Sequence, residues 1–200
     1  MAESVVVPQL LEMPTATGYG LGQTILEAGL CMAPGGLMMM LFAPVSSRLI
    51  GTVGAKLTLM VGAAVLGGGY VVAFFLMDAP WQLLVASCIA CAGVGIGYAA
   101  MPTLILDAVP LREAASAVGL NALMRSVGTT LAAAVMGTIL TSRTMALGPG
   151  VEVPTMGAFQ LCFVAGAVAA FLGVAIAATI PRRGTVEPAP AVQREARTAA

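Results

Sequence analysis

The chain has 200 residues, of which 59% are hydrophobic and only 9% are charged, with a mean hydropathy of +0.98. About a quarter of the residues in a water-soluble domain are charged, so this composition excludes that class and predicts a membrane protein. The 9 basic and 9 acidic residues cancel and histidine is absent, which argues against a nucleic-acid partner and against histidine-based zinc sites, triads and proton shuttles.

Residues 1–23 are expected to form an outer N-terminal segment. Its start, Val5–Pro8, resembles the outer end of an apolar helix, and we expect an upstream helix that this sequence does not contain. The following residues, 24–180, are expected to form the transmembrane bundle, because apolar stretches long enough to cross about 30 Å of hydrocarbon recur through them.

Five such stretches follow in chain order, and short joints between them make neighbouring helices antiparallel. The fold class is therefore all-α and integral to the membrane. The predicted spans are Thr24–Ser47, Leu57–Met77, Trp81–Leu106, Ala115–Leu140 and Gly157–Ile180.

After the last span the composition changes to Pro, Arg, Glu and Ala, so residues 181–200 are expected to be a disordered tail. Basic residues in short loops stay on the cytoplasmic side. One set of alternating loops holds only Arg143, whereas the other holds Arg48, Lys56, Arg112, Arg182 and Arg183. We therefore expect the N-terminus outside and the C-terminal tail in the cytoplasm.

Helix-disrupting residues recur in the first and third spans. Proline removes a backbone donor, and such interruptions are tolerated in lipid where protein or a cavity satisfies the freed carbonyl. Two interpretations stay open, namely a moving or cavity-lining role, as in transporters with broken helices, and simple close packing through small residues. The residues concerned are Pro34, Gly35, Gly36, Pro44, Gly93, Gly97 and Pro102.

Arg125 is the strongest candidate for a functional residue. It lies about ten residues into the fourth span, roughly 15 Å from the predicted cytoplasmic end, where a charge costs at least about 2.5 kcal/mol. Asn121 and Thr129 share its helix face at a spacing of four residues. We expect Arg125 to face a wet cavity or the bundle interior. The alternative is a guanidinium that extends toward the inner headgroups.

Glu27 is the sole carboxylate within the predicted spans, and it lies near the outer end of the first one. At that depth we expect it to miss Arg125, although it remains a possible outer proton or cation ligand. The four cysteines, at positions 31, 88, 91 and 162, lie in apolar runs and predict no disulfide framework. With no carboxylate pair or activated nucleophile visible, we expect no enzyme activity, no cofactor and no metal site.

Three stretches resemble the major facilitator superfamily, in particular its fourteen-helix drug:proton antiporter branch. Ser47–Lys56 is similar to the family's cytoplasmic loop motif: Leu49, Gly54 and Lys56 fit it beside Arg48, while Gly51 and Thr52 occupy its Asp and Arg positions. Gly119–Gly128 is similar to the segment that opens the penultimate helix of that branch. Pro8–Leu11 with Gly18–Gly22 resembles the loop before the second helix of the C-terminal half.

The resemblance implies the last five helices of a proton-coupled exporter of small amphipathic compounds. It would lie in a bacterial inner membrane and contact lipid, substrate, protons and an N-terminal half absent from this sequence. Arg125, Asn121, Thr129 and Glu27 would then belong to the substrate or ion pathway. One incomplete half cannot alternate between two faces, so we expect the chain alone to be inactive. The alternative function is a non-transporting membrane module that packs against a partner protein.

Overall fold

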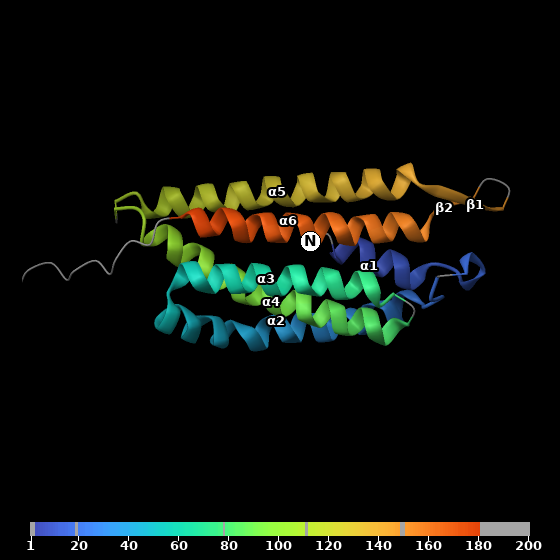
Figure 1. Cartoon of the computed structure of the whole chain (residues 1–200), viewed down its shortest axis with the longest axis horizontal. Coiled ribbons are helices and arrows are strands. Elements are labelled where there is room, and N and C mark those ends of the chain that lie inside the picture. Colours follow the sequence, from blue (N-terminus) through green and yellow to red (C-terminus); the bar gives the residue numbers. More distant parts are fainter. Residues whose placement is uncertain (1–2, 19, 78, 111, 149–150, 181–200) are drawn as a thin grey trace, which may run out of the picture.

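The computed structural model describes residues 3–18, 20–77, 79–110, 112–148 and 151–180. Long helices dominate it (Figure 1). In chain order the elements are α1 (Glu3–Glu12), the 3-10 helix η1 (Thr15–Thr17), α2 (Ile25–Val53), α3 (Ala55–Phe75), α4 (Pro80–Leu106), α5 (Ala114–Ser142), β1 (Thr144–Gly148), β2 (Val151–Pro154) and α6 (Met156–Thr179).

Five of these helices, α2 to α6, are long and apolar enough to cross a membrane, which confirms the predicted fold class. Most predicted spans agree with the observed helices to within two residues, but α2 continues six residues past the predicted end at Ser47. The predicted joint at residues 48–56 is therefore wrong, because nearly all of it is helical. The chain turns at Gly54 alone, whose φ of 88° suits a residue without a Cβ.

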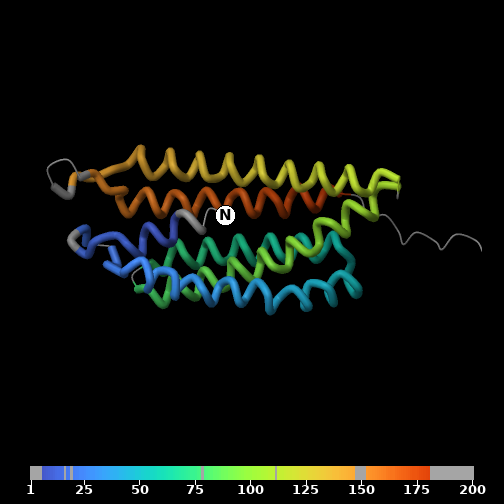
Figure 2. The backbone as a smooth tube through the Cα atoms, turned by 180° about the vertical axis from the view of Figure 1, so that it is seen from behind, coloured from blue at the N-terminus to red at the C-terminus, as the bar shows by residue number. Residues whose placement is uncertain are grey.

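The helices form two layers, with α5 and α6 in one and α2, α3 and α4 in the other (Figures 1 and 2). Helix α1 lies between the layers in the half of the bundle nearer β1 and β2, where Val6, Leu10 and Leu11 are each only 1% exposed, and α3 packs directly on α6 beyond it. The N-terminal segment thus begins as a helix packed into the bundle. The location of residues 1–23 on the outer side of the membrane stays a prediction. The apolar side chains of α1 are buried because they complete the core formed with Phe159 and Phe163.

The α3–α4 contact depends on glycine. A Cβ added at Gly62 would lie 2.6 Å from the amide nitrogen of Gly97, and one at Gly93 would lie 2.5 Å from the amide nitrogen of Leu66. These distances are shorter than real Cβ contacts, so the two backbones approach as closely as they do only because the side chains are absent. For Gly93 and Gly97, close packing is therefore what the structure shows.

The prolines of α2 and α4 lie inside continuous helices. Helix α2 continues through Pro34 and Pro44, and α4 continues through Pro102. Contacts beside α2's prolines hold it against α4: Gly35 packs against Ser87 and Cys91, and the buried Ser46 hydroxyl donates a 2.8 Å hydrogen bond to the Ile96 carbonyl. These prolines therefore do not end α2 or α4, because packing offsets the one hydrogen bond that each proline removes. The kinks and the gating role predicted for Pro34, Gly35, Gly36 and Pro102 stay predictions.

The connection from α5 to α6, predicted as an irregular loop over residues 141–156, is a hairpin. Helix α5 extends to Ser142, and strands β1 and β2 then pair antiparallel with Thr144 opposite Pro154. The Thr144 hydroxyl donates a 2.9 Å hydrogen bond to the Glu152 carboxylate. This hairpin marks one end of the bundle, called here the hairpin end (Figure 1).

The opposite end, called here the basic end, holds the α2–α3 and α4–α5 junctions and the end of α6. There the Lys56 ammonium donates a 2.8 Å hydrogen bond to the Ala178 carbonyl and another to the Ile180 carbonyl. A cation suits the carbonyls that end a helix because they carry partial negative charge. The two sets of loops distinguished by their basic residues thus lie at opposite ends. The predicted cytoplasmic tail, 181–200, lies outside the described residues.

Candidate functional site

The polar side chains of α5 share the helix face that was predicted from the sequence. Asn121 and Thr129 are half-buried on that face, and Arg125 lies between them with an exposed side chain. The Thr129 hydroxyl donates a 2.8 Å hydrogen bond to the Arg125 carbonyl one turn earlier. The burial of Asn121 and Thr129 shows that this face is turned toward the bundle.

Arg125 reaches across to α4. Its guanidinium carbon lies 5.0 Å from the ring centroid of Tyr98, within the range of a cation–π interaction. Tyr98 was not among the residues singled out in the sequence. It lies eight residues before the end of α4, and Arg125 lies eleven after the start of α5. Because these helices are antiparallel and share the basic end, counting from their junction places both residues at comparable depth, and that count could have found the pair.

The direction of the guanidinium bears on the alternative interpretation of Arg125. At helical rise the residue lies roughly 16 Å from the start of α5, near the middle of a hydrocarbon core. A guanidinium extending to the headgroups would leave this depth. In the structure it instead stays over the ring of a neighbouring helix. This arrangement supports the orientation toward the bundle.

Glu27 has a different set of partners. It is the third residue of α2 and closes a capping box, in which its carboxylate accepts 2.8 Å hydrogen bonds from both the amide and the hydroxyl of Thr24. The Glu27 amide in turn donates to the Thr24 hydroxyl at 3.3 Å. Such a box satisfies backbone donors that a helix start leaves free. In the part of the chain that the structure describes, no carboxylate forms an ion pair with Arg125.

The residues predicted to form the cytoplasmic loop motif make a structural joint between α2 and α3. Arg48 and Leu49 lie in the last two turns of α2, where the Thr52 hydroxyl donates a 3.0 Å hydrogen bond to the Arg48 carbonyl. Gly54 makes the turn, and Lys56 ties the start of α3 to the end of α6. Together these contacts fix the basic end of the bundle.

The helix-disrupting residues fall in several places and do not form one site. Gly35 packs on α4, whereas a Cβ added at Gly36 would meet nothing within 4 Å. Pro102 lies one turn beyond Tyr98, whose carbonyl therefore lacks its usual amide donor. Among the helix-disrupting residues, Pro102 alone removes a backbone hydrogen bond of Tyr98, the residue that contacts Arg125.

Two of the candidate spans are poorly covered by the rest of the chain. In α5 the buried residues are Met136 and Leu140, both toward the hairpin end, and in α2 they are Ala28, Gly35 and Ser46. Arg125 thus lies in the half of α5 nearer the basic end, where few side chains are buried by the described residues. The exposed large side chains of α5 are Leu120, Leu123, Met124, Val127, Leu131 and Val135.

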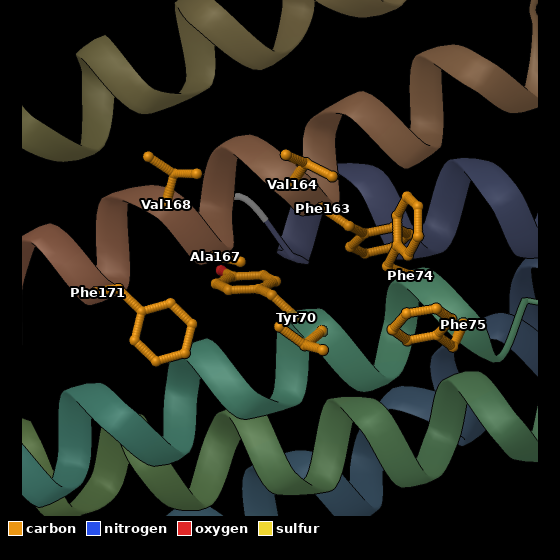
Figure 3. A pocket seen from close by; sticks show the side chains of 9 residues that line it. Tyr70, Phe74, Phe75, Phe163, Val164, Ala167, Val168 and Phe171 are labelled. Atoms are coloured by element: carbon orange, nitrogen blue, oxygen red, sulfur yellow. The ribbon is translucent and has the colours of Figure 1, made fainter.

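A separate groove of about 250 Å³ lies between α3 and α6 (Figure 3). Its lining is aromatic and aliphatic, and such a surface suits hydrocarbon. Among the described residues no cluster of His, Cys, Asp or Glu could hold a metal ion. The groove residues are Tyr70, Val71, Phe74, Phe75, Phe163, Val164, Ala167, Val168 and Phe171.

Comparison with known families decides the class of the protein. The sequence matches the Major Facilitator Superfamily over residues 2–200. The chain belongs to this superfamily. Its members are membrane transporters, and the family predicted from the sequence is confirmed.

Curated relatives of the chain include two sequences called "Multidrug resistance protein Stp", from Mycobacterium tuberculosis strains CDC 1551 / Oshkosh and ATCC 25618 / H37Rv. Each is 27% identical to the chain over 120 residues, which is 60% of this chain and 22% of the relative. The matched region is therefore less than a quarter of those proteins. No solved structure matches the chain.

Proposed function

We propose that the chain is the C-terminal part of a proton-coupled exporter of small amphipathic compounds, from the fourteen-helix branch of the superfamily. The multidrug resistance relatives support the substrate class and a bacterial inner membrane, since both are bacterial proteins. Their greater length supports a larger whole, in which residues 24–180 form most of one half. The grouping of Lys56 and Arg112 at the basic end supports a cytoplasmic location for that end.

The proposal rests on the position of Arg125. Its guanidinium lies over the Tyr98 ring, and it belongs to α5, a helix with few buried residues. A charge near the middle of the membrane is costly, and it normally faces a bundle interior or a water-filled pathway. Arg125, Asn121 and Thr129 would line such a pathway between this bundle and the polypeptide that completes it. Exposed apolar faces on α2 and α5 would contact that polypeptide.

The test is gradient-driven export by the intact gene product that contains this chain. Cells or everted vesicles would be loaded with two naphthalene dyes, neutral N-phenyl-1-naphthylamine and anionic 8-anilino-1-naphthalenesulfonate. Export of at least one dye, abolished by a protonophore, is expected. Arg125→Ala should slow export of at least one dye at equal membrane abundance.

Two results would count against the proposal. If Arg125→Ala exports both dyes as well as the unmodified protein, Arg125 has no role in the pathway. If the intact product moves neither dye and a proton gradient changes nothing, the non-transporting membrane module becomes the better explanation.

A further inference from the structure

We infer that Arg125, held by Tyr98, binds the acidic group of anionic amphipathic substrates such as carboxylates, sulfonates and phosphate esters. This inference rests on the proposed export function and assigns a substrate class to its site. Three features of the described residues support it: the sign of the charge, the groups that surround it, and the open side of α5.

The charge balance of the candidate spans is the first feature. Their charged residues are Glu27, Arg48, Lys56 and Arg125, and Arg125 is the one that lies far from both ends of its helix. Glu27 is engaged by Thr24, and Lys56 by the carbonyls of α6. The middle of the described bundle therefore carries one positive charge. A low-dielectric surrounding strengthens its attraction for an anion.

The geometry of the guanidinium is the second feature. Tyr98 contacts Arg125 through a ring face, and a cation–π contact uses no N–H donor. In the described part of the chain, the hydrogen bond that involves Arg125 is made by its backbone carbonyl. The planar fork of five N–H donors thus has no assigned acceptor. That fork matches carboxylate, sulfonate and phosphate oxygens, to which it can donate two parallel hydrogen bonds.

The surroundings are the third feature. Asn121, one turn before Arg125, offers both an amide donor and a carbonyl acceptor. Val118 and Ala132, two turns before and after Arg125 on the same helix face, are apolar and half-buried, and could contact the apolar body of a substrate. An anionic headgroup on an apolar ring system therefore fits this stretch of α5 better than a cation, which Arg125 would repel.

The experiment compares the two naphthalene dyes, which share their ring system and differ by one sulfonate. Efflux of each is measured with the intact gene product in proteoliposomes under an imposed proton gradient. Arg125→Gln should lower export of the sulfonate dye by about tenfold or more, the size expected when a charge-assisted hydrogen-bonded contact is lost. Export of the neutral dye should change by less than about twofold, because it does not use the charge.

Two further variants keep the result interpretable. Arg125→Lys retains the charge without the planar fork, so it should keep an intermediate rate for the sulfonate dye. Arg143→Gln, which removes an exposed cation at the far end of α5, should leave both dyes unaffected. Equal reconstitution of all variants, measured by immunoblot, excludes loss of folding as the cause.

The outcomes separate the inference from the proposed function. If Arg125→Gln lowers export of both dyes equally, Arg125 serves structure or pairs with a carboxylate of the completing polypeptide, and the inference is wrong while export stands. If the intact product exports the neutral dye under a proton gradient but does not export the sulfonate dye, the inference is likewise wrong and export stands. If the intact product moves neither dye, the proposed function itself fails.

Discussion

A guanidinium in the middle of a bilayer needs a partner, and in this chain Arg125 has an aromatic ring in that role. The sequence identified Arg125 because depth follows from counting residues along a helix. Counting from the α4–α5 junction also places Tyr98 at a comparable depth, but that count leaves open which side of α4 faces α5. For Glu27, the sequence did indicate the observed role, which is helix capping. Thr24 and Glu27 have the three-residue spacing of a capping box, but the rarity of carboxylates in the spans directed attention to charge instead.

The contact between Tyr98 and Arg125 leads to a prediction about the ring. Tyr98→Leu removes the π-face and should lower export of the sulfonate dye by about three- to tenfold, which corresponds to a cation–π contribution of about 1 kcal/mol. Tyr98→Phe keeps the face and should stay within about twofold of the unmodified protein. Initial efflux rates in proteoliposomes measure both. A Leu variant as fast as the Phe variant would show that the ring does not position Arg125.

The capping box at the start of α2 predicts that Glu27 stabilises the helix through its hydrogen bonds and that export does not require its negative charge. Glu27→Gln retains a side-chain acceptor for Thr24 and should export both dyes within about twofold of the unmodified protein. Glu27→Ala should lower the midpoint of thermal unfolding, because it removes the acceptor for the Thr24 amide and hydroxyl. Loss of gradient-driven export in the Gln variant, at normal stability, would instead assign Glu27 to proton or cation binding.

At the scale of elements, hydropathy predicts helices well and their connections poorly. Each apolar run became a helix, because backbone groups in hydrocarbon must be satisfied within the segment. The end of α2 was missed because Arg48 and Ser47 look like loop residues, although the chain needs only Gly54 to turn. Helix α1 was missed because it is too short to span a membrane. Its helical state depends on burial between other helices.

Some glycines of a helix allow a neighbouring helix to approach closely and others face open space. Helix α3 contains one of each kind, Gly62 and Gly68, which can be compared. Gly62 contacts the α4 backbone, whereas a Cβ added at Gly68 would meet nothing within 4 Å. Gly62→Ala should therefore destabilise the protein by about 1–3 kcal/mol through overpacking. Gly68→Ala should be neutral or stabilising by up to about 1 kcal/mol, since alanine favours helix.

Unfolding in increasing concentrations of sodium dodecyl sulfate, followed by circular dichroism, measures the difference. The two substitutions add the same methyl group to the same helix, so helix propensity and expression are controlled together. Equal stability of the two variants would contradict the close α3–α4 contact.

At the scale of the whole molecule, α5 and α6, the two helices of one layer, differ in the surfaces that they expose. Helix α6 has no charged residue or proline and exposes apolar side chains such as Phe171 and Ile176. Helix α5 exposes a charge beside hydroxyl groups such as Ser126 and Thr130. The apolar surface of α6 is compatible with contact to lipid acyl chains, whereas such contact is unfavourable for the charge on α5. Overall hydropathy could not reveal this asymmetry, because it depends on which side of each helix the rest of the chain covers.

This asymmetry predicts that α6 faces lipid and α5 faces protein or a wet pathway in the intact gene product. Leu123 on α5 and Leu172 on α6 are a matched pair, at 56% and 57% exposed, and both lie in the half of their helix nearer the basic end. Each would be replaced by tryptophan in a background without other tryptophans, Trp81 included. Lipids brominated on their acyl chains quench tryptophan on contact, so Leu172→Trp should be quenched strongly and Leu123→Trp weakly. Equal quenching would mean that α5 also faces acyl chains. Leu123 is two residues from Arg125 and lies on the opposite side of the helix, so that result would contradict the asymmetry between α5 and α6 and leave the contact of Arg125 with α4 in place.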